Sequence, residues 1–290
     1  MTRFLRRAPI LGFLASLLFA TAAVGAERWA TIDYPGAVTT AAYGINERGD
    51  IVGRWIDDDA TVHGYLLRHG RFTSIDVPDS TFTGALDINN LGEIVGRYFD
   101  AAGVSRGFTW KDGDFTSFDY PGSIDTRGRG IDDFGRVTGN HTTENGHEHG
   151  FLLDREGYHS IDFPRSEKTN IWDINLLGRL VGWFLDTDDL FHGLTLKNGV
   201  FTVIDFPGAV DTQLFGINPQ GDIVGVYDVG DGVPHGLLRT TSGMTSFDFP
   251  GSSGTFGFRI NAQGDVVGSY TDDDANVHGY LWRRRGQHAE

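Results

Sequence analysis

A short motif recurs six times along the chain at a constant interval of 43 residues. It reads Ile or Phe, Asp, an aromatic residue or Val, and Pro, and its Asp is found at Asp33, Asp76, Asp119, Asp162, Asp205 and Asp248. Two glycine positions, which begin at Gly49 and Gly53, keep the same interval through all six copies. Internal repeats of about 20–50 residues are typical of solenoids, propellers and other arrays. The interval therefore predicts that one small structural unit is built six times.

One copy, residues 41–79, contains signals for four β-strands. Asn46 followed by Gly49 between two short apolar segments predicts a tight hairpin turn. The other segments alternate apolar and polar residues and are rich in Val, Ile, Phe and Tyr, which favours strands. Pro78 ends the last of them because it has no N–H to donate to a sheet. Four antiparallel strands in about 43 residues match one propeller blade, so we predict an all-β fold.

The two ends of the repeated region predict how the array closes. Residues 29–35 match a fourth strand that lacks the three strands before it, and the last copy ends after its third strand. Pairing the two segments would complete a six-bladed β-propeller of four-stranded antiparallel blades, with the ring closed by the N-terminal strand. Such closure would leave no open sheet edges. The predicted blades span approximately residues 41–79, 84–122, 127–165, 170–208, 213–251, and 256–285 together with 28–35.

The first 26 residues predict a cleavable secretory signal peptide. Three arginines precede the apolar run 8–20, and small residues up to Ala26 form a cleavage site. An uncleaved membrane anchor is the alternative, which we disfavour because the run is short for a membrane span. Residues 27–290 would then form a single domain, and we expect the protein to be secreted or periplasmic.

The charge of the chain narrows the choice of partners. Without residues 1–26, which contain three Arg and no acid, the formal net charge at pH 7 changes from −15 to −18. A surface this acidic disfavours nucleic acid and anionic lipid. The chain has no Cys, so core packing without disulfides must stabilise it. We expect a monomer with no membrane span in the mature chain, and a protein or a glycan as its partner.

The repeated units resemble a known family. Gly-Ile-Asn-x-x-Gly-Asp-Ile-Val-Gly at 44–53 and His-Gly-Tyr-Leu at 63–66 look like the HAF-type extracellular repeat, which is named for a His-Ala-Phe signature. The resemblance covers residues 29–285. It departs from the family by having Gly where Ala is usual, and Arg106 where the second copy should have His. The resemblance implies export and a repeated β fold, and it implies no established activity.

Polar residues that recur six times are expected to be structural, since an active site is needed only once. Thr40 recurs in all six copies, and His63 recurs as His149, His192, His235 and His278. In a propeller these residues would lie at the same face as the Asp column that begins at Asp33. We therefore expect Asp, Thr and His to form a hydrogen-bonded network that locks the blades together. A catalytic relay with Thr as nucleophile is the alternative that we disfavour.

Departures from the repeat are where a site is expected. The loops between strands two and three are acidic in blades one, four, five and six, which are neighbours in a closed ring. The candidate metal ligands in these loops are Asp57, Asp58, Asp59, Asp186, Asp188, Asp272, Asp273 and Asp274. Carboxylates suit Ca²⁺, but no loop has the EF-hand spacing. Solvated acidic loops that keep the protein soluble are the favoured interpretation, and no cofactor is predicted.

The matching region of blades two and three is basic and contains additional His residues. The candidate ligand-binding residues there are Arg106, Arg127, Arg129, His141 and His147. Arg127 and Arg129, on the innermost strand of blade three, could bind a carboxylate or phosphate bidentately. They could equally form ion pairs with an acid of a neighbouring blade, such as Asp87, Asp132 or Asp173. A transition-metal site at His141 and His147 is disfavoured because too few further ligands are free.

These patterns favour a secreted binding or interaction module over an enzyme. Its ligand or partner would lie on the face formed by the strand two–three loops around the central channel. The alternatives are a structural scaffold and a channel-centred hydrolase, lactonase or lyase. Candidate residues for such an enzyme are Asp87, Asn170, Asp173 and Gln213. Strand alternation places 87 and 173 on the opposite face from 170 and 213, which weakens the enzyme alternative.

Overall fold

The computed structural model describes residues 13–14 and 28–284, and its strands confirm the all-β prediction. Nearly all of them fall into groups of four consecutive antiparallel strands. Group 1 contains β3 (Thr39–Ile45), β4 (Ile51–Ile56), β5 (Val62–Arg68) and β6 (Arg71–Ile75). Group 2 contains β7 (Phe82–Ile88), β8 (Ile94–Phe99), β9 (Ser105–Lys111) and β10 (Asp114–Phe118). Group 3 contains β11 (Asp125–Ile131), β12 (Val137–Thr142), β13 (Glu148–Asp154) and β14 (Gly157–Ile161).

The second half of the chain repeats this pattern. Group 4 contains β15 (Lys168–Ile174), β16 (Leu180–Leu185), β17 (Phe191–Lys197) and β18 (Val200–Val203). Group 5 contains β19 (Asp211–Ile217), β20 (Ile223–Asp228), β21 (His235–Thr240) and β22 (Gly243–Phe247). Group 6 contains β23 (Gly254–Ile260), β24 (Val266–Thr271), β25 (Val277–Arg283) and, from the other end of the chain, β2 (Arg28–Ile32).

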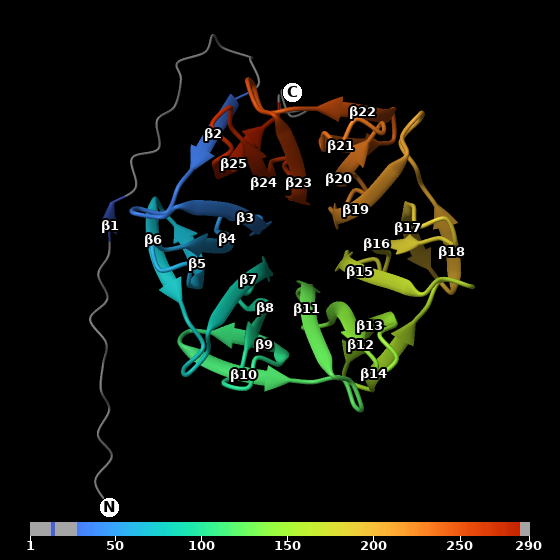
Figure 1. Ribbon diagram of the computed structural model, residues 1–290, viewed down its shortest axis with the longest axis horizontal. Coiled ribbons are helices and arrows are strands. Elements are labelled where there is room, and N and C mark those ends of the chain that lie inside the picture. The colour runs from blue at the N-terminus through green and yellow to red at the C-terminus, as the bar shows by residue number, and fades with distance from the viewer. Residues whose placement is uncertain (1–12, 15–27, 285–290) are drawn as a thin grey trace, which may run out of the picture.

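The groups are arranged around a common centre, with β3, β7, β11, β15, β19 and β23 innermost (Figure 1). We call the region enclosed by these six strands the hub. Strand β2 pairs antiparallel with β25, so that Trp29 lies opposite Trp282. Strand β3 packs against β24 and β25 in the way that β7 packs against β4 and β5. The first and last groups are therefore neighbours in space.

Of the predicted signal peptide, only Phe13–Leu14 (β1) belong to the described residues. They pair antiparallel with Phe72 and Arg71 of β6. The remainder of residues 1–26, including the predicted cleavage position after Ala26, lies outside the described residues. Within the described part of the chain, no helix has the length and apolarity that a membrane crossing requires.

Each innermost strand contains a β-bulge at the same point of its pairing with the second strand. In group 1, Ala42 pairs with Gly53 and Gly44 pairs with Val52, so Tyr43 is left without a partner. A bulge places two successive residues opposite one and interrupts the alternation of faces. The expectation that alternation separates 87 and 173 from 170 and 213 is therefore wrong, because the bulge lies between them.

Neighbouring groups are joined by stacked rings. Phe249, in the loop after group 5, stacks on Tyr270 with ring centroids 3.6 Å apart, and Tyr270 stacks on His278 at 5.1 Å. Equivalent stacks form in groups 1, 3, 4 and 5. Parallel-stacked rings of this kind bury large apolar surfaces. The repeated aromatic positions therefore belong to the core between groups.

The repeated Asp, Thr and His residues divide into two separate interactions, which corrects the predicted single network. His63 contacts Asp76 at 2.7 Å, and His149, His192, His235 and His278 contact Asp162, Asp205, Asp248 and Asp33 in the same way. Thr40 instead accepts a hydrogen bond from the main-chain N–H of Tyr34 at 3.0 Å, as its counterparts do. Thr therefore holds the loop between groups, and among the described residues no hydrogen bond joins it to the repeated Asp or His.

Candidate functional site

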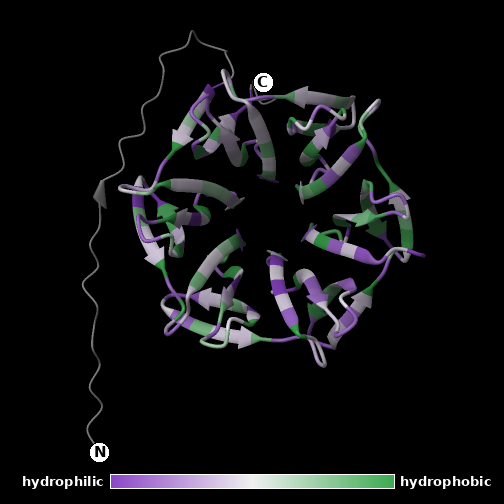
Figure 2. Cartoon of the chain, in the orientation of Figure 1, coloured by the Kyte–Doolittle hydropathy of each residue, from purple (hydrophilic) through white to green (hydrophobic). Residues whose placement is uncertain are grey.

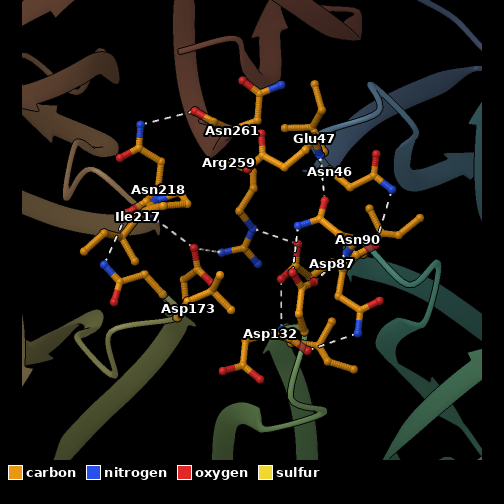
Figure 3. A pocket seen from close by; sticks show the side chains of 18 of the residues that line it. Asn46, Glu47, Asp87, Asn90, Asp132, Asp173, Ile217, Asn218, Arg259 and Asn261 are labelled. Carbon is orange, nitrogen blue, oxygen red and sulfur yellow. Dashed lines mark hydrogen bonds and ion pairs between the residues drawn. The ribbon is translucent and has the colours of Figure 1, made fainter. Parts of the chain in front are cut away.

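One end of the hub, which we call the rim end, is formed by the turns that follow the innermost strands. Each turn begins with Asn or Asp, at Asn46, Asn89, Asp132, Asn175, Asn218 and Asn261. Four of these amides donate to the carbonyl of the equivalent residue in the next group, at 3.0–3.3 Å. Glu47 accepts from the N–H of Ala262 at 2.9 Å, which connects the first and last groups. The rim is thus a belt of hydrogen bonds (Figure 3).

A buried ion-pair cluster lies within the rim end. Arg259, 4% exposed, contacts Asp87 at 3.0 Å and Asp173 at 2.9 Å, as Figure 3 shows. Its guanidinium also donates to the carbonyls of Phe215 at 2.9 Å and Arg129 at 3.0 Å. Burial raises the pKa of Asp87 to about 7 in spite of Arg259, because Asp173 adds a second negative charge. The cluster ties together innermost strands from five groups, and its charged atoms are occupied by one another.

The ion-pair cluster depends on glycines in the intervening groups. The six equivalent positions are Gly44, Asp87, Gly130, Asp173, Gly216 and Arg259, so that glycine alternates with a charged residue around the hub. A Cβ on Gly130 would lie 2.6 Å from the carbonyl oxygen of Trp172 and 3.0 Å from the Cα of Asp173. Glycine is required there because the neighbouring innermost strand approaches too closely for a side chain.

The rim end offers few free groups to a ligand or a substrate. Its cavity encloses about 500 Å³, counting the part open to solvent, but many of its polar groups hydrogen-bond to one another. Asp87 and Asp173 both face Arg259, while Asn170 donates to Glu148 at 3.0 Å and Gln213 lines a different pocket. The four residues predicted for an enzyme are therefore not gathered at one point.

An apolar layer formed by bulge residues lies next to the ion-pair cluster. Tyr43, Leu86, Phe215 and Phe258 are buried in one cluster, and Trp172 packs against it. Tyr43 and Phe258 stack at 4.5 Å, and Trp172 and Phe215 lie 4.4 Å apart. We call this the hub layer. It separates the rim end from the opposite end of the hub, where the strand two–three loops lie, which we call the loop end.

The loop end of groups 1 to 3 carries four half-buried arginines. Arg127 and Arg129 lie on β11, which shows hydrophilic bands in Figure 2, while Arg54 and Arg97 lie on β4 and β8. The positive charges of Arg127 and Arg54 add to burial in lowering the pKa of Arg97 to about 10. Burial, followed by the charges of Arg97 and Arg127, lowers the pKa of Arg129 to about 9. The four guanidinium groups are thus close enough to repel one another.

Two carboxylates lie beside these arginines. Asp125 contacts Arg127 at 2.9 Å. Glu148 lies 3.8 Å from Arg127 and accepts from the amides of Asn140 at 3.1 Å and Asn170 at 3.0 Å. The predicted ion-pair partners Asp87, Asp132 and Asp173 are engaged elsewhere, with Arg259 and Arg136. The strand register explains this correction, because those acids lie at the rim end.

The loop end of groups 4 to 6 contains a pocket. It encloses about 700 Å³, counting the part open to solvent, and is lined by Phe191, Gln213, Pro234, Phe256 and Asp211, among others. The space within it that a water-sized group can occupy is about 370 Å³, which falls in the range of roughly 300–1,000 Å³ that is common for ligand sites. Asp211 accepts from the N–H of Phe191 at 2.8 Å. The Gln213 amide has no hydrogen-bond partner among the described residues, so it is free to bind a ligand.

The pocket and the arginines share the hub layer as their floor. Val226 lines the pocket and belongs to the buried cluster of the layer, and Phe256 packs against that cluster. On the other side, Arg54 lies over the ring of Tyr43 at 5.5 Å and Arg129 over the ring of Trp172 at 4.2 Å. The loop end is therefore cationic over groups 1 to 3 and aromatic over groups 4 to 6.

The other predicted ligand residues lie outside this arrangement. Arg106 takes the place of the repeated His and contacts Asp100 at 2.8 Å and also Asp119. His141 is buried in the aromatic stack of group 3, with its ring centroid 3.6 Å from that of Tyr120, and neither ring nitrogen has a hydrogen-bond partner within the described part of the chain. Burial and the neighbouring His149 lower the pKa of His141 to about 4. His147 is half-buried beside that stack.

The acidic loops are turns that cap themselves. Asp57 accepts from the main-chain N–H groups of Asp59 at 3.0 Å and Thr61 at 2.8 Å. Asp186 and Asp272 do the same in their loops. The remaining predicted metal ligands, Asp58, Asp59, Asp188, Asp273 and Asp274, are exposed. Among the described residues, no three His, Asp or Glu side chains are placed to hold a metal ion, so the predicted Ca²⁺ ligands are not gathered into a site.

Two of the arginines and most of the pocket were missed in the sequence. The signal for them is variation among equivalent positions. Residues at equivalent positions of the six groups form a column. The column that begins with Arg54 and Arg97 continues as Asn140, Trp183, Val226 and Ser269. The column of Phe256 contains Ala41, Gly84, Arg127, Asn170 and Gln213. The residues in hub-facing columns vary among the groups, whereas those in the columns between groups repeat.

No family model and no curated protein matches the chain. Solved structures with similar coordinates include AofleA from Arthrobotrys oligospora, at 13% identity and a TM-score of 0.58, covering 89% of this chain and 86% of that chain. SapL1 lectin, solved with alpha methyl fucoside, gives 12% identity and a TM-score of 0.56, covering 87% of this chain and 98% of that chain. A fungal lectin from Aleuria aurantia is described as a six-bladed β-propeller with a novel fucose recognition mode. It gives 11% identity and a TM-score of 0.55, covering 84% of this chain and 92% of that chain. The likeness shows that this chain has a β-propeller fold.

Proposed function

We propose that the protein is a carbohydrate-binding module, built as a closed six-bladed β-propeller, whose ligand site is the pocket at the loop end of groups 4 to 6. The observation that carries the proposal is the pocket's lining, which combines the rings of Phe191 and Phe256 with the free amide of Gln213 and the carboxylate of Asp211. A sugar ring has an apolar C–H face and a polar hydroxyl edge. Aromatic surfaces with a few placed polar groups fit that shape.

Asymmetry and fold likeness support this assignment. The pocket forms where group 5 departs from the repeat: Pro234 replaces the residue that begins the third strand elsewhere, and its loop has a positive φ at Gly230 in addition to the one that every group has at the position of Gly232. Several similar solved structures are lectins, and SapL1 lectin was solved in complex with a fucoside. In this proposal the ligand binds at the loop end, on the face formed by the strand two–three loops around the hub. We also propose that the signal peptide exports the protein, as the resemblance to the HAF-type repeat implies.

The enzyme alternative has less support. A channel-centred hydrolase or lyase needs a general acid or base, such as a carboxyl group that is free to exchange a proton with a substrate. The carboxylate of Asp211, in the pocket, accepts from the N–H of Phe191. Asp87 and Asp173 are buried against Arg259, while Asp125 and Glu148 are engaged with Arg127 and two amides. A pure scaffold would have no reason to leave the Gln213 amide free in a pocket. Binding is therefore the function that the geometry favours.

The test is direct binding of saccharides to the protein. Neutral and acidic oligosaccharides are screened on an array, and hits are measured by titration calorimetry. We expect Phe256→Ala and Gln213→Ala each to weaken binding about tenfold, the equivalent of one aromatic or hydrogen-bonded contact. Phe134→Ala is the matched control, since Phe134 is 73% exposed in a rim-end turn. Absence of any binding at millimolar saccharide, or equal binding by all variants, would contradict the proposal.

A further inference from the structure

We propose that Arg54 and Arg97 form an anion subsite beside the pocket, so that the saccharide ligand carries an acidic group, either a carboxylate or a sulfate ester. This inference rests on the proposed function, because it assigns the class of ligand for the same end of the hub. The shared chemistry is an oxyanion with two or three oxygens, which matches the planar fork of a guanidinium.

The first argument is the balance of charge. Four arginines lie at the loop end of groups 1 to 3, and the carboxylates beside them are Asp125 and Glu148. Both carboxylates contact Arg127. Arg129 donates to the amide oxygen of Asn140 at 3.2 Å. Among the described residues, neither Arg54 nor Arg97 has an ion pair with a carboxylate. Two positive charges are therefore left for an external anion.

The second argument is desolvation. Arg54 and Arg97 are only partly accessible, and the buried Nε of Arg54 has no hydrogen-bond partner in residues 13–14 and 28–284. Leaving a buried donor unpaired is unfavourable, more so for a charged group. An oxyanion would supply acceptors to these N–H groups and would offset the mutual repulsion of the arginines. The protein thus holds part of a binding site ready before the ligand arrives.

The third argument is the orientation of the guanidinium groups by aromatic rings. Arg97 lies over the ring of Phe82 at 4.8 Å and over that of Phe99 at 5.4 Å. Phe82 and Phe99 are a cross-strand pair whose rings are 4.8 Å apart. Arg54 lies over the ring of Tyr43. Stacking on a ring uses the face of a guanidinium and leaves its N–H edges free for hydrogen bonds.

The arginines and the pocket are placed to serve one ligand. Tyr43, beneath Arg54, and Val226, in the pocket, belong to the same buried cluster of the hub layer. A ligand whose sugar rings occupy the pocket can therefore extend across this layer toward the arginines. A long saccharide with charged groups along its length fits that division better than a small neutral sugar.

The experiment separates the subsite from the pocket. First, thermal unfolding of the ligand-free protein is compared in sodium sulfate, sodium acetate and sodium chloride at equal ionic strength. We expect sulfate or acetate to raise the Tm by about 2 °C above chloride, as a site partly saturated by its ion would. Arg97→Gln and Arg54→Gln should each abolish the difference. Arg155→Gln, the same change at an exposed turn in group 3, should retain it.

Second, affinities are compared for a uronic-acid oligosaccharide, the same oligosaccharide with its carboxyls methyl-esterified, and a sulfated oligosaccharide. We expect an acidic form to bind about tenfold more tightly than the ester, and the ratio to fall to near one in Arg97→Gln. The carboxylate and sulfate arms show which oxyanion is preferred. If acid and ester bind alike and no anion shifts the Tm, the subsite is wrong while saccharide binding stands. If no oligosaccharide binds but anions still raise the Tm through Arg97, the proposed function fails and the anion site remains.

Discussion

The indole of Trp29 lies flat against the indole of Trp282, with ring centroids 5.0 Å apart and planes inclined by 6°. The two residues are a cross-strand pair between β2 and β25, so the contact joins the first and last segments of the array. Phe247 and Phe249 complete an aromatic cluster around them. In a chain without disulfides, this contact is a principal link between the two ends.

Removing the Trp29 ring should therefore weaken the whole array. Trp29→Ala deletes a half-buried aromatic side chain, and we expect the free energy of unfolding to fall by about 2–3 kcal/mol. Urea denaturation followed by tryptophan fluorescence and circular dichroism measures the change. Arg28→Ala, one residue earlier on the exposed side of β2, is the control and should change stability little. Equal losses in the two variants would show that the ring contact is not what stabilises the junction.

Replacing one charged residue of the Arg259 cluster should lower the stability of the protein strongly, whereas replacing all three together should lower it much less. Arg259→Gln leaves two buried carboxylates facing each other, and we expect it to destabilise the protein by about 3–5 kcal/mol. Replacing the cluster as a whole, by Arg259→Met with Asp87→Asn and Asp173→Asn, should recover a large part of that loss. The measurement is the midpoint of urea unfolding for each variant. A triple variant no more stable than Arg259→Gln would contradict this account.

His141 should make stability fall in acid. Its pKa is lowered from 6.5 to about 4 in the folded protein, so the unfolded chain takes up the proton first as the pH falls. The free energy of unfolding therefore decreases between about pH 6.5 and pH 4, by about 3 kcal/mol from this group. His141→Phe restores the aromatic residue of the repeat and should remove that loss. The free energy of unfolding of the variant should exceed that of the parent protein by more at pH 4 than at pH 7.

A control separates this effect from the other histidines. Hydrogen bonds to two aspartates raise the pKa of His192 and His278, against the opposing effect of burial. Their contribution is present at low pH and is lost as the pH rises through the folded pKa, the opposite direction to His141. His192→Phe should therefore change the pH profile in the opposite direction to His141→Phe. Parallel pH profiles for His141→Phe and the parent protein would refute the assignment.

Gly130 should not accept a side chain. An added Cβ would lie 2.6 Å from the Trp172 carbonyl oxygen, so Gly130→Ala has to displace the next innermost strand. We expect a loss of about 1–3 kcal/mol, as in other overpacked sites. Gly84→Ala is a matched control on β7, because its Cβ would meet side chains and no main chain, with the ring of Phe82 nearest at 3.3 Å and Leu86 next at 3.9 Å. Similar unfolding midpoints for the two variants would mean that the hub accommodates the extra atom.

Several parts of the fold follow directly from the residues of a single repeat. The Asn and Gly of each hairpin turn, the Pro that ends the fourth strand and the alternating apolar segments all act within one copy. They predicted the strands, and the orphan segment 29–35 predicted the partner of the last strand. The candidate site was predicted less completely. Arg127 and Arg129 were found because they stand out on one innermost strand, whereas Arg54 and Arg97 look like ordinary exposed residues of a second strand.

The amino-acid sequence by itself determined the repeated unit, its strands and turns, and the aromatic and His–Asp contacts between neighbours, because these interactions recur within or next to each copy. Only the tertiary structure decided what meets inside the hub. The bulge after Ala42 and its equivalents changes which face a side chain takes, and the circular arrangement brings Arg259 to Asp87 and Asp173. Each hub-facing column holds residues that vary among the groups. Its members interact only after six distant segments converge, so no local pattern records their contacts.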